Sequence, residues 1–339
     1  MAPNIDWKNL GFTYMQTECY VRADFKNGTW GKLQVCKEPY MQMHIAATCF
    51  HYGQACFEGL KAFTQKDGSV AVFRPEQNAR RMNDTAKRLM MQTIPEELFL
   101  EAVNTVIMLN KDWVPPYGTG ASLYLRPLLI GSSAHVGVHP SEEYILLVLC
   151  MPVGPYYKNG FFPVKALVQE NYDRAAPKGV GNVKAAGNYA AGMMGDFDGK
   201  KKGYPISLYL DSATHTCIDE FGTSNFFGIT KDNHYVTPDS TSILPSITNS
   251  SLQILAKDFG MVVEKRAIPF TELTQFTEVG ACGTAAVITP VYSITRGDSV
   301  FRFGKENEAG PNLTRFFKQI QGIQYGEIED KHGWMVKVK

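Results

Sequence analysis

A stretch near the middle of the chain places one lysine among very small residues. Lys184 is followed by Ala185, Ala186 and Gly187, and it lies three residues after Gly181. Such neighbours leave the amine open to a flat ring, and a lysine that loses water in this setting has a lowered pKa. A lowered pKa supplies the neutral amine that Schiff-base formation requires.

Two other interpretations of this stretch are weighed beside that one. On composition alone, an ordinary exposed lysine at the start of a helix accounts for the same residues. A nucleotide-phosphate loop does not, because Val183 precedes the lysine and Ala185 follows it, whereas GxxxxGK[ST] requires glycine and a hydroxyl residue there. A nucleotide-binding module is therefore the weakest alternative.

Other residues offer what a pyridine cofactor on this lysine would need, namely a carboxylate, a hydroxyl donor and a phosphate site. Glu220 lies between two strand-like segments, where a partly buried carboxylate needs a positive partner. Tyr189 follows the lysine by five residues and carries a phenol. Residues 244–248 open a predicted helix, whose free amides and positive dipole end can bind a phosphate. Each feature alone is common in proteins.

The fold that positions these residues is formed by a chain of 339 residues, and this length favours two domains. Residues 151–163 concentrate proline, glycine and aromatic residues between strand-like segments and are predicted to connect the domains. We therefore expect a smaller α/β domain over residues 1–150 and a larger, cofactor-binding domain over residues 164–339. A hydrophobic content of 44% against 20% charged residues supports a sizeable core.

Periodicity and turn residues predict the elements of both domains. Helices are expected over residues 75–91, 93–113, 184–200 and 247–259, the second opening with a Thr93/Glu96 capping box and the last closed by Gly260. Strands are expected over residues 122–130, 144–150, 164–169, 206–211 and 226–229. The loop over residues 131–140 is a candidate pocket wall.

Charge and cysteine usage narrow the possible partners. The chain has 34 basic and 33 acidic residues, so no net field favours nucleic acid or an anionic membrane, and small molecules are the expected partners. Seven scattered cysteines form no CxxC pair, which indicates reduced thiols in the cytoplasm and no metal site. The longest apolar run, over residues 144–153, is far shorter than the ~20 residues that span a bilayer, so no membrane segment is expected.

The chain resembles the branched-chain amino-acid aminotransferases, which are class IV aminotransferases. The resemblance rests on several blocks in the family's order: His51-Tyr52-Gly53, Phe57-Glu58-Gly59, Val72-Phe73-Arg74-Pro75 with Arg81, Leu123-Tyr124-Leu125-Arg126-Pro127, Lys184 to Tyr189, Glu220 to Phe226, Leu244 to Thr248, Gly283-Thr284-Ala285, Gln324-Tyr325-Gly326 and Gly333-Trp334. It implies the fold-type IV pyridoxal-phosphate architecture, an α/β fold of the α+β type with the active site at the interface of two domains.

The resemblance also implies the roles of the cofactor-binding residues. Lys184 would bond to pyridoxal 5'-phosphate and act as general base and acid, and Tyr189 would donate to the ring oxygen. Glu220 would pair with the ring nitrogen. The phosphate would be bound by Arg81, by the amides of Ile247 and Thr248, and by the hydroxyl of Thr284.

A further set of residues is implied for the substrates, which would be L-leucine, L-isoleucine or L-valine exchanging with 2-oxoglutarate in a ping-pong reaction. Tyr124, Arg126 and the turn at Thr284 and Ala285 would bind the carboxylate, with Thr223 nearby. The apolar pocket would be lined by Tyr52, Phe57, Val138 and Tyr156. Family members take Tyr52 and Val138 from a neighbouring subunit, which implies a homodimer; core packing is the alternative explanation for all four.

Two positions depart from the family pattern. Asn249 stands where an arginine often follows the Ile-Thr pair, and Ala286-Val287-Ile288-Thr289 replaces the CxxC of some animal members. The alternatives that remain are another enzyme of this architecture, such as a D-amino-acid aminotransferase or an aminodeoxychorismate lyase, and a catalytically silent ligand-binding homologue.

Overall fold

A computed structural model describes residues 5–155 and 160–339. The described residues form two compact units. The first comprises residues 5–155 together with Lys184–Gly187 and Gln321–Lys339, and the second comprises residues 160–183 together with Asn188–Ile320. The mixed α/β architecture that the sequence predicts is confirmed.

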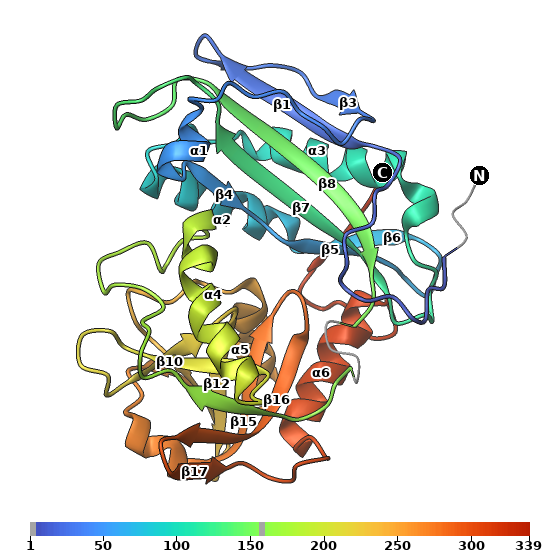
Figure 1. The fold of residues 1–339 in the computed structure, drawn as a ribbon. Helices are drawn as coiled ribbons and strands as arrows, with labels where there is room; N and C mark the ends of the chain where they lie inside the picture. The colour runs from blue at the N-terminus through green and yellow to red at the C-terminus, as the bar shows by residue number, and fades with distance from the viewer. Residues whose placement is uncertain (1–4, 156–159) are drawn as a thin grey trace. The chain divides into compact units, whose positions relative to one another are not determined.

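The first unit is built on a nine-stranded sheet (Figure 1). Its main path runs β18-β6-β5-β7-β8-β1-β2, while β3 pairs with β1 and β4 pairs with β7. The strands are β1 (Tyr20–Lys26), β2 (Thr29–Trp30), β3 (Gln34–Cys36), β4 (Ala55–Phe57), β5 (Leu60–Thr64), β6 (Val70–Phe73), β7 (Ser122–Gly131), β8 (Tyr144–Val153) and β18 (Met335–Lys337). The helices are α1 (Thr48–Tyr52), α2 (Pro75–Arg88), α3 (Glu96–Leu109) and the 3₁₀ turn η1 (Lys111–Trp113).

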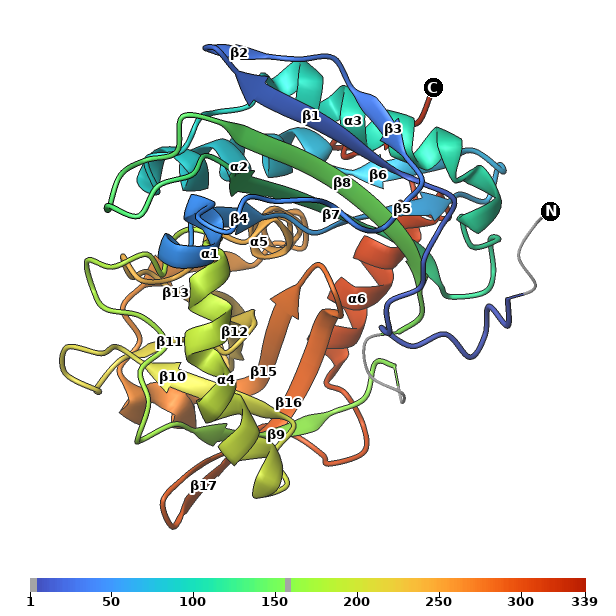
Figure 2. The same cartoon turned by 45° about the horizontal axis from the view of Figure 1, so that its top comes forward.

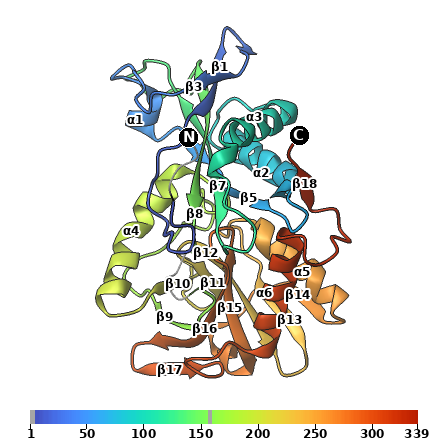
Figure 3. The same ribbon diagram turned by 90° about the vertical axis from the view of Figure 1, so that its right-hand side faces the viewer.

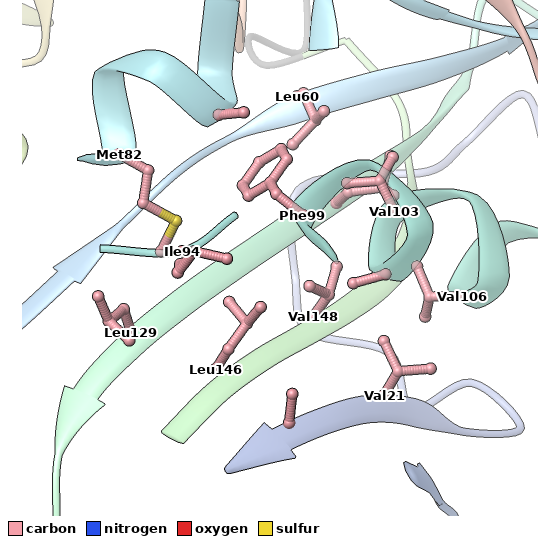
Figure 4. Close-up of a cluster of buried hydrophobic side chains, with 14 of the residues drawn as sticks. Val21, Leu60, Met82, Ile94, Phe99, Val103, Val106, Leu129, Leu146 and Val148 are labelled. Carbon is pink, nitrogen blue, oxygen red and sulfur yellow. The ribbon is translucent and has the colours of Figure 1, made fainter. Parts of the chain in front are cut away.

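Helices α2 and α3 cover one face of this sheet (Figure 2). Figure 4 shows Phe99, Val103 and Val106 of α3 packing toward Leu146 and Val148 of β8. These residues are almost fully buried, as the apolar stripe in the sequence predicts. The long strands β7 and β8 are buried along most of their length, which explains their nearly continuous apolar sequence.

The predicted Thr93/Glu96 capping box is wrong. Helix α3 begins at Glu96, its N-cap residue is Pro95, and no side chain caps it. The ring of Pro95 fixes an extended entry to the helix, so Thr93 lies three residues before the first helical residue. The carbonyl of Thr93 instead accepts a hydrogen bond from the indole of Trp30 at 2.8 Å.

The C-terminal segment returns to the first unit. Strand β18 pairs antiparallel with β6, and the amide of Arg74 donates to the carbonyl of Trp334 at 2.7 Å. The Trp334 ring packs edge-on against Phe73 at 5.6 Å, and Tyr325 packs against Phe63 at 5.2 Å. The sequence analysis assigned these C-terminal residues to the second domain, and their aromatic side chains are what tie them to the first unit.

The second unit contains another nine-stranded sheet, in the order β11-β10-β9-β16-β15-β12-β13-β14, with β17 paired to β16. Its strands are β9 (Val164–Val168), β10 (Ile206–Leu210), β11 (Ile218–Phe221), β12 (Ser224–Thr230), β13 (His234–Pro238), β14 (Val262–Arg266), β15 (Phe276–Gly283), β16 (Val287–Arg296) and β17 (Ser299–Arg302). The helices are α4 (Ala186–Lys201), α5 (Ile247–Asp258), α6 (Pro311–Gln324) and the 3₁₀ turn η2 (Phe270–Gln275).

Because β11 also pairs with β12, strands β9, β10, β11, β12, β15 and β16 close into a barrel. Its core includes Leu208, Phe226, Phe276 and Ile294. Figure 3 shows α4 on one side of these strands and α5 and α6 on the other. Helix α4 approaches closely through Gly195, where an added Cβ would lie 2.3 Å from the hydroxyl of Tyr209.

Two further sequence predictions concern the helices of this unit. The end of the helix predicted over residues 247–259 is confirmed. This helix is α5, its last residue is Asp258, and Gly260 follows with a φ of +75°. Helix α4 begins at Ala186, so Lys184 precedes it rather than opening it. Among the described residues, no helix is long and apolar enough to cross a membrane.

Candidate active site

The backbone of Lys184 is anchored in the first unit. Its amide donates to the hydroxyl of Thr85 at 3.0 Å, and that hydroxyl donates to the carbonyl of Arg81 at 2.9 Å. The carbonyl of Lys184 accepts from the amide of Phe57 at 3.3 Å, and Ala185 forms a β-bridge with Cys56. These contacts fix the lysine against α2 and β4, two elements of the same unit.

The side chain of Lys184 has the electrostatic setting that the sequence predicts. Burial and, to a smaller extent, the positive charge of Arg81 lower its pKa from 10.5 to about 8, while the charge of Glu58 opposes the change. Its Nζ lies 4.7 Å from the centre of the Phe57 ring. A substantial fraction of the amine is therefore neutral near physiological pH, which is the form that attacks a carbonyl.

Arg81 forms a two-pronged ion pair with a buried carboxylate. Its Nε donates to Oε1 of Glu58 at 2.8 Å, and its Nη2 donates to Oε2 at 2.7 Å. Asn78 also donates to Oε2, at 2.7 Å. Burial alone would raise the pKa of Glu58, but Arg81, Lys184 and Asn78 outweigh burial and hold the pKa below its ordinary value.

The sequence analysis quoted Glu58 within a family block but gave it no role. Its side chain is fully buried, and it joins the two cations Arg81 and Lys184 in one network. The signal that could have identified it is the cost of burying a carboxylate in an apolar strand segment without a cation. Arg81 is thus positioned by Glu58, and its contact with phosphate stays a prediction.

Tyr124 and Arg126 lie beside this network, on β7. Nη2 of Arg126 donates to the hydroxyl of Tyr124 at 3.0 Å, and the Arg126 guanidinium lies 4.6 Å from the centre of the Phe57 ring. One aromatic ring therefore contacts both Arg126 and Lys184. Gly59 makes room for this arrangement, since an added Cβ would lie 2.2 Å from the hydroxyl of Tyr124.

Arg126 differs from the other arginines of the site in lacking a carboxylate partner among the described residues. Its Nε is buried and has no hydrogen-bond partner there. A buried guanidinium nitrogen without an acceptor is costly, because it has lost water and gained nothing in return. The arrangement is suited to an incoming carboxylate, which accepts two parallel hydrogen bonds from arginine.

A second lysine of the first unit shares the electrostatic setting of Lys184. Lys61 lies on β5 directly opposite Tyr124 on β7, and burial lowers its pKa from 10.5 to about 8. The sequence analysis missed this lysine, because its neighbours Leu60, Ala62 and Phe63 read as a plain core strand. A lowered lysine pKa alone therefore does not identify the reactive amine.

In the second unit, Glu220 lies in the barrel wall on β11. Its Oε1 accepts from Nη1 of Arg174 at 2.8 Å and from the amide of Leu244 at 3.0 Å, and its Oε2 accepts from Asn225 at 3.2 Å. Its side chain is 3% exposed. The positive partner that the sequence analysis required is Arg174, which also donates to the carbonyl of Ser242 at 2.9 Å.

The start of α5 lies close to this carboxylate, because Leu244 comes two residues before the N-cap Ser246. The hydroxyl of Ser246 accepts from the amide of Asn249 at 3.1 Å. The amides of Ile247 and Thr248, in the first turn, have no acceptor within the helix. They are therefore the groups of α5 that can bind an anion, as predicted from the sequence.

Asn249 has a structural role in this chain. Its Oδ1 accepts from the hydroxyl of Tyr235 at 2.7 Å, and its Nδ2 donates to the hydroxyl of Thr237 at 2.9 Å. Both partners belong to β13, so Asn249 fastens the first turn of α5 to the barrel sheet. Its side chain points toward these two hydroxyl groups of the sheet.

The turn between β15 and β16 contains the last predicted contacts, Thr284 and Ala285. Cys282, just before this turn, pairs across strands with Asn225, the residue that donates to Glu220. Val287 follows the turn with a φ of +64°, a conformation that costs a β-branched residue free energy. Glu220, the start of α5 and this strained turn thus belong to one end of the barrel.

The other predicted residues are placed as follows. Tyr189 lies half-buried in the first turns of α4, and Thr223 is exposed in the turn between β11 and β12. Tyr52 is 37% exposed and Val138 is 88% exposed, both in the first unit. Tyr156 lies outside the described residues. The structure thus brings Phe57, Arg81, Tyr124, Arg126 and Lys184 together in the first unit.

Comparison with known proteins agrees with this geometry. The family model of the class IV aminotransferases matches residues 55–294. The branched-chain-amino-acid aminotransferase of Haemophilus influenzae is 47% identical, covering 99% of both chains, and that of Helicobacter pylori is 45% identical, covering 99% of this chain and 98% of the relative. The crystal structure of the Escherichia coli branched-chain amino acid aminotransferase matches with a TM-score of 0.81 at 27% identity, covering 95% of this chain and all of that one.

The family model covers all the residues described above around Lys184 in the first unit, and it covers Glu220 with its neighbours at one end of the barrel. Class IV aminotransferases are transaminases that use pyridoxal phosphate. The chemistry of these groups suits that cofactor: the amine of Lys184 can bond to an aldehyde, the carboxylate of Glu220 can pair with a ring nitrogen, and the first-turn amides of α5 can bind a phosphate. The chain belongs to the class IV aminotransferases, the family of the branched-chain-amino-acid aminotransferases.

Proposed function

We propose that this protein transfers amino groups between L-leucine, L-isoleucine or L-valine and 2-oxoglutarate by a ping-pong reaction. The observation that carries the proposal is the buried Nε of Arg126, which has no acceptor among the described residues and lies beside the Phe57 ring that also contacts Lys184. A carboxylate bound there would lie in the same network as the reactive amine. The names of the two bacterial relatives support the choice of branched-chain substrates.

Residues with three kinds of chemistry would hold pyridoxal 5'-phosphate. Lys184 would bond to its aldehyde, Tyr189 would donate to its ring oxygen, and Glu220 would accept from its ring nitrogen. Arg174 supports this role of Glu220, because it gives the buried carboxylate a positive partner at 2.8 Å. Arg81, Ile247, Thr248 and Thr284 would bind the phosphate. Once bound, the cofactor withdraws electrons from the substrate's α-carbon.

Lys184 would move the proton of the reaction. Its pKa of about 8 lies near physiological pH, where a general base and acid works best. Glu58 restrains the fall of this pKa, and Arg81 promotes it. The ion pair between these two residues therefore tunes the amine that accepts and returns the proton.

The substrate carboxylate would be bound by Arg126 and Tyr124, whose hydrogen bond orients the guanidinium. Arg126 could also receive the second carboxylate of glutamate, so that one site serves both substrates. Phe57 would contribute to an apolar pocket for the branched chain. Such a pocket separates similar aliphatic chains by only about 1–3 kcal/mol, so all three amino acids should be used.

We further propose that the enzyme acts as a cytoplasmic homodimer. Exposed apolar side chains from two segments of the first unit, one of which includes α1, support a subunit interface: Ile45, Phe50, Tyr52, Val136 and Val138. The two segments are held together by a β-bridge between Ala47 and Ala134 and by the His135 amide, which donates to the Ala46 carbonyl at 2.9 Å. Seven free cysteines are typical of a reducing compartment.

The test compares two amines that have the same side chain, one with a carboxylate and one without. Arg126→Met keeps the apolar stem and removes the charge, so kcat/KM for L-leucine should fall by a factor corresponding to about 2–5 kcal/mol. 3-Methylbutylamine, which has the same side chain but no carboxylate, should be affected far less. An equal loss for both amines would refute the role of Arg126. Activity with D-alanine instead of L-leucine, or pyruvate release from aminodeoxychorismate, would refute the proposed function.

A further inference from the structure

The loop over residues 131–143 brings together three side chains that no part of the proposed reaction uses. His135, His139 and Glu142 each offer one ligand atom, and these atoms lie within 4.8 Å of one another. The two imidazole rings are 5.2 Å apart between their centres. The sequence analysis expected no metal site because it weighed only the spacing of the cysteines.

We propose that His135, His139 and Glu142 form a site for a divalent transition-metal ion of the zinc class. Two imidazoles and a carboxylate are ligands that Zn²⁺ prefers, whereas Mg²⁺ and Ca²⁺ prefer sites made of oxygen atoms alone. Three protein ligands leave a fourth position for water or for another group.

The first argument is the state of His135. Its Nε2 is buried and has no hydrogen-bond partner among the described residues. Buried polar atoms are nearly always paired, so an unpaired imidazole nitrogen beside a second imidazole and a carboxylate indicates a missing ligand. The backbone of His135 is fixed, because its amide donates to the carbonyl of Ala46 at 2.9 Å.

The second argument is the orientation of His139. Its Nδ1 lies 2.6 Å from the carbonyl of Pro140, which can accept a hydrogen bond but cannot donate one. This contact places the proton on Nδ1 and leaves the lone pair of Nε2 for a metal. A histidine whose other nitrogen donates to a backbone carbonyl is the usual arrangement around a protein-bound metal.

The third argument is the rigid base of the loop. The hydroxyl of Ser133 accepts from the amides of Glu142 and Glu143 at 2.7 and 2.9 Å, and it lies 2.7 Å from the hydroxyl of Ser141. These bonds fix the backbone of Glu142 to Ser133, two residues before His135. Tetrahedral zinc bonds of about 2.0–2.1 Å require ligand atoms roughly 3.3 Å apart. The side chain of Glu142 is exposed and can shorten its distance to the imidazoles by rotating.

The site does not depend on the proposed transaminase reaction, so it is tested by binding. Untagged holoenzyme, freed of metal with a chelator, is titrated with Zn²⁺ by calorimetry and with Co²⁺ by visible absorption. We expect saturation at one ion per chain, cobalt bands typical of tetrahedral coordination, and no competition from Mg²⁺.

Variants at the two exposed ligands provide the decisive comparison. His139→Ala and Glu142→Gln should each weaken Zn²⁺ binding by about tenfold or more, since even losing an outer partner of a metal ligand costs about 10–100-fold. His332→Ala removes an exposed imidazole outside the cluster and serves as the matched control, so its affinity should equal that of the unaltered protein. Absence of saturable binding, or equal affinity in all four proteins, would overturn the proposal.

Discussion

The lowered pKa of Lys184 predicts that the protein pays for its reactive amine in stability. The pKa of this side chain falls from 10.5 to about 8 in the folded chain. Each unit by which a pKa shifts corresponds to about 1.4 kcal/mol. Keeping the amine of Lys184 protonated in the folded chain therefore lowers the free energy of unfolding by about 3 kcal/mol at pH 7. Lys184→Met keeps a similar apolar stem without the charge. The variant should lose turnover, and its free energy of unfolding should rise by up to about that amount.

The pH dependence of this gain follows from the same shift. Below pH 8 both the folded and the unfolded chain hold the proton, so the full cost is present. Between pH 8 and 10.5 the folded amine loses its proton before the unfolded one does, and the cost fades as pH rises. The stability advantage of Lys184→Met should therefore be largest at pH 7 and small near pH 10.

Urea unfolding of the cofactor-free proteins measures this difference, because bound cofactor would add its own stabilisation. Lys61→Met is the matched control, since burial lowers the pKa of Lys61 to about 8 as well. It should gain stability to a similar extent and retain turnover. If Lys184→Met is no more stable than the unaltered protein at pH 7, or if its advantage does not decline toward pH 10, the reasoning is wrong.

Three other substitutions test the network around the site. Glu58→Gln leaves Arg81 without its buried partner, so it should lower the free energy of unfolding by about 3–5 kcal/mol. It should also move the acid limb of the pH-rate profile to lower pH, because Glu58 raises the pKa of Lys184. An unchanged denaturation midpoint would argue against the importance of the ion pair. Glu220→Gln should retain cofactor by spectrum but slow proton abstraction in stopped-flow traces, since a neutral amide cannot keep the ring nitrogen protonated, and normal turnover would exclude the role. Gly59→Ala places a methyl group 2.2 Å from the unmoved Tyr124 hydroxyl, so it should raise KM for L-leucine more than for 3-methylbutylamine; equal changes would count against the carboxylate site.

The pattern of apolar residues along the sequence was sufficient to predict the helices and strands that bury a continuous set of apolar side chains. Helix α2 begins at Pro75 as the sequence predicts, and the strands around residues 122–130 and 144–150 are found with their ends extended by one to three residues. Their apolar periodicity is set by neighbours close in sequence. The predicted capping box does not form, because the ring of Pro95 fixes the backbone conformation at the start of the helix and leaves Thr93 outside it.

Features that depend on residues far apart in sequence could not be predicted in this way. The pairing of β18 with β6, the pairing of β9 with β16 in the barrel, and the ion pair between Arg174 and Glu220 all join distant segments. The predicted role of Arg126 came from resemblance to a family, and that of Lys184 came from its small neighbours together with the same resemblance. Glu58 was missed, because its importance follows from being buried between two cations, which only the fold reveals.

The central claim is that Lys184, and not Lys61, bonds to the cofactor. Both amines are buried enough to have a pKa of about 8, so the electrostatics alone do not separate them. Reducing the holoenzyme with borohydride fixes the cofactor to its lysine, and mass spectrometry of the digested peptides identifies the site. We expect the added mass on the peptide that contains Lys184 alone. Added mass on Lys61, on any other lysine, or on none would contradict the account.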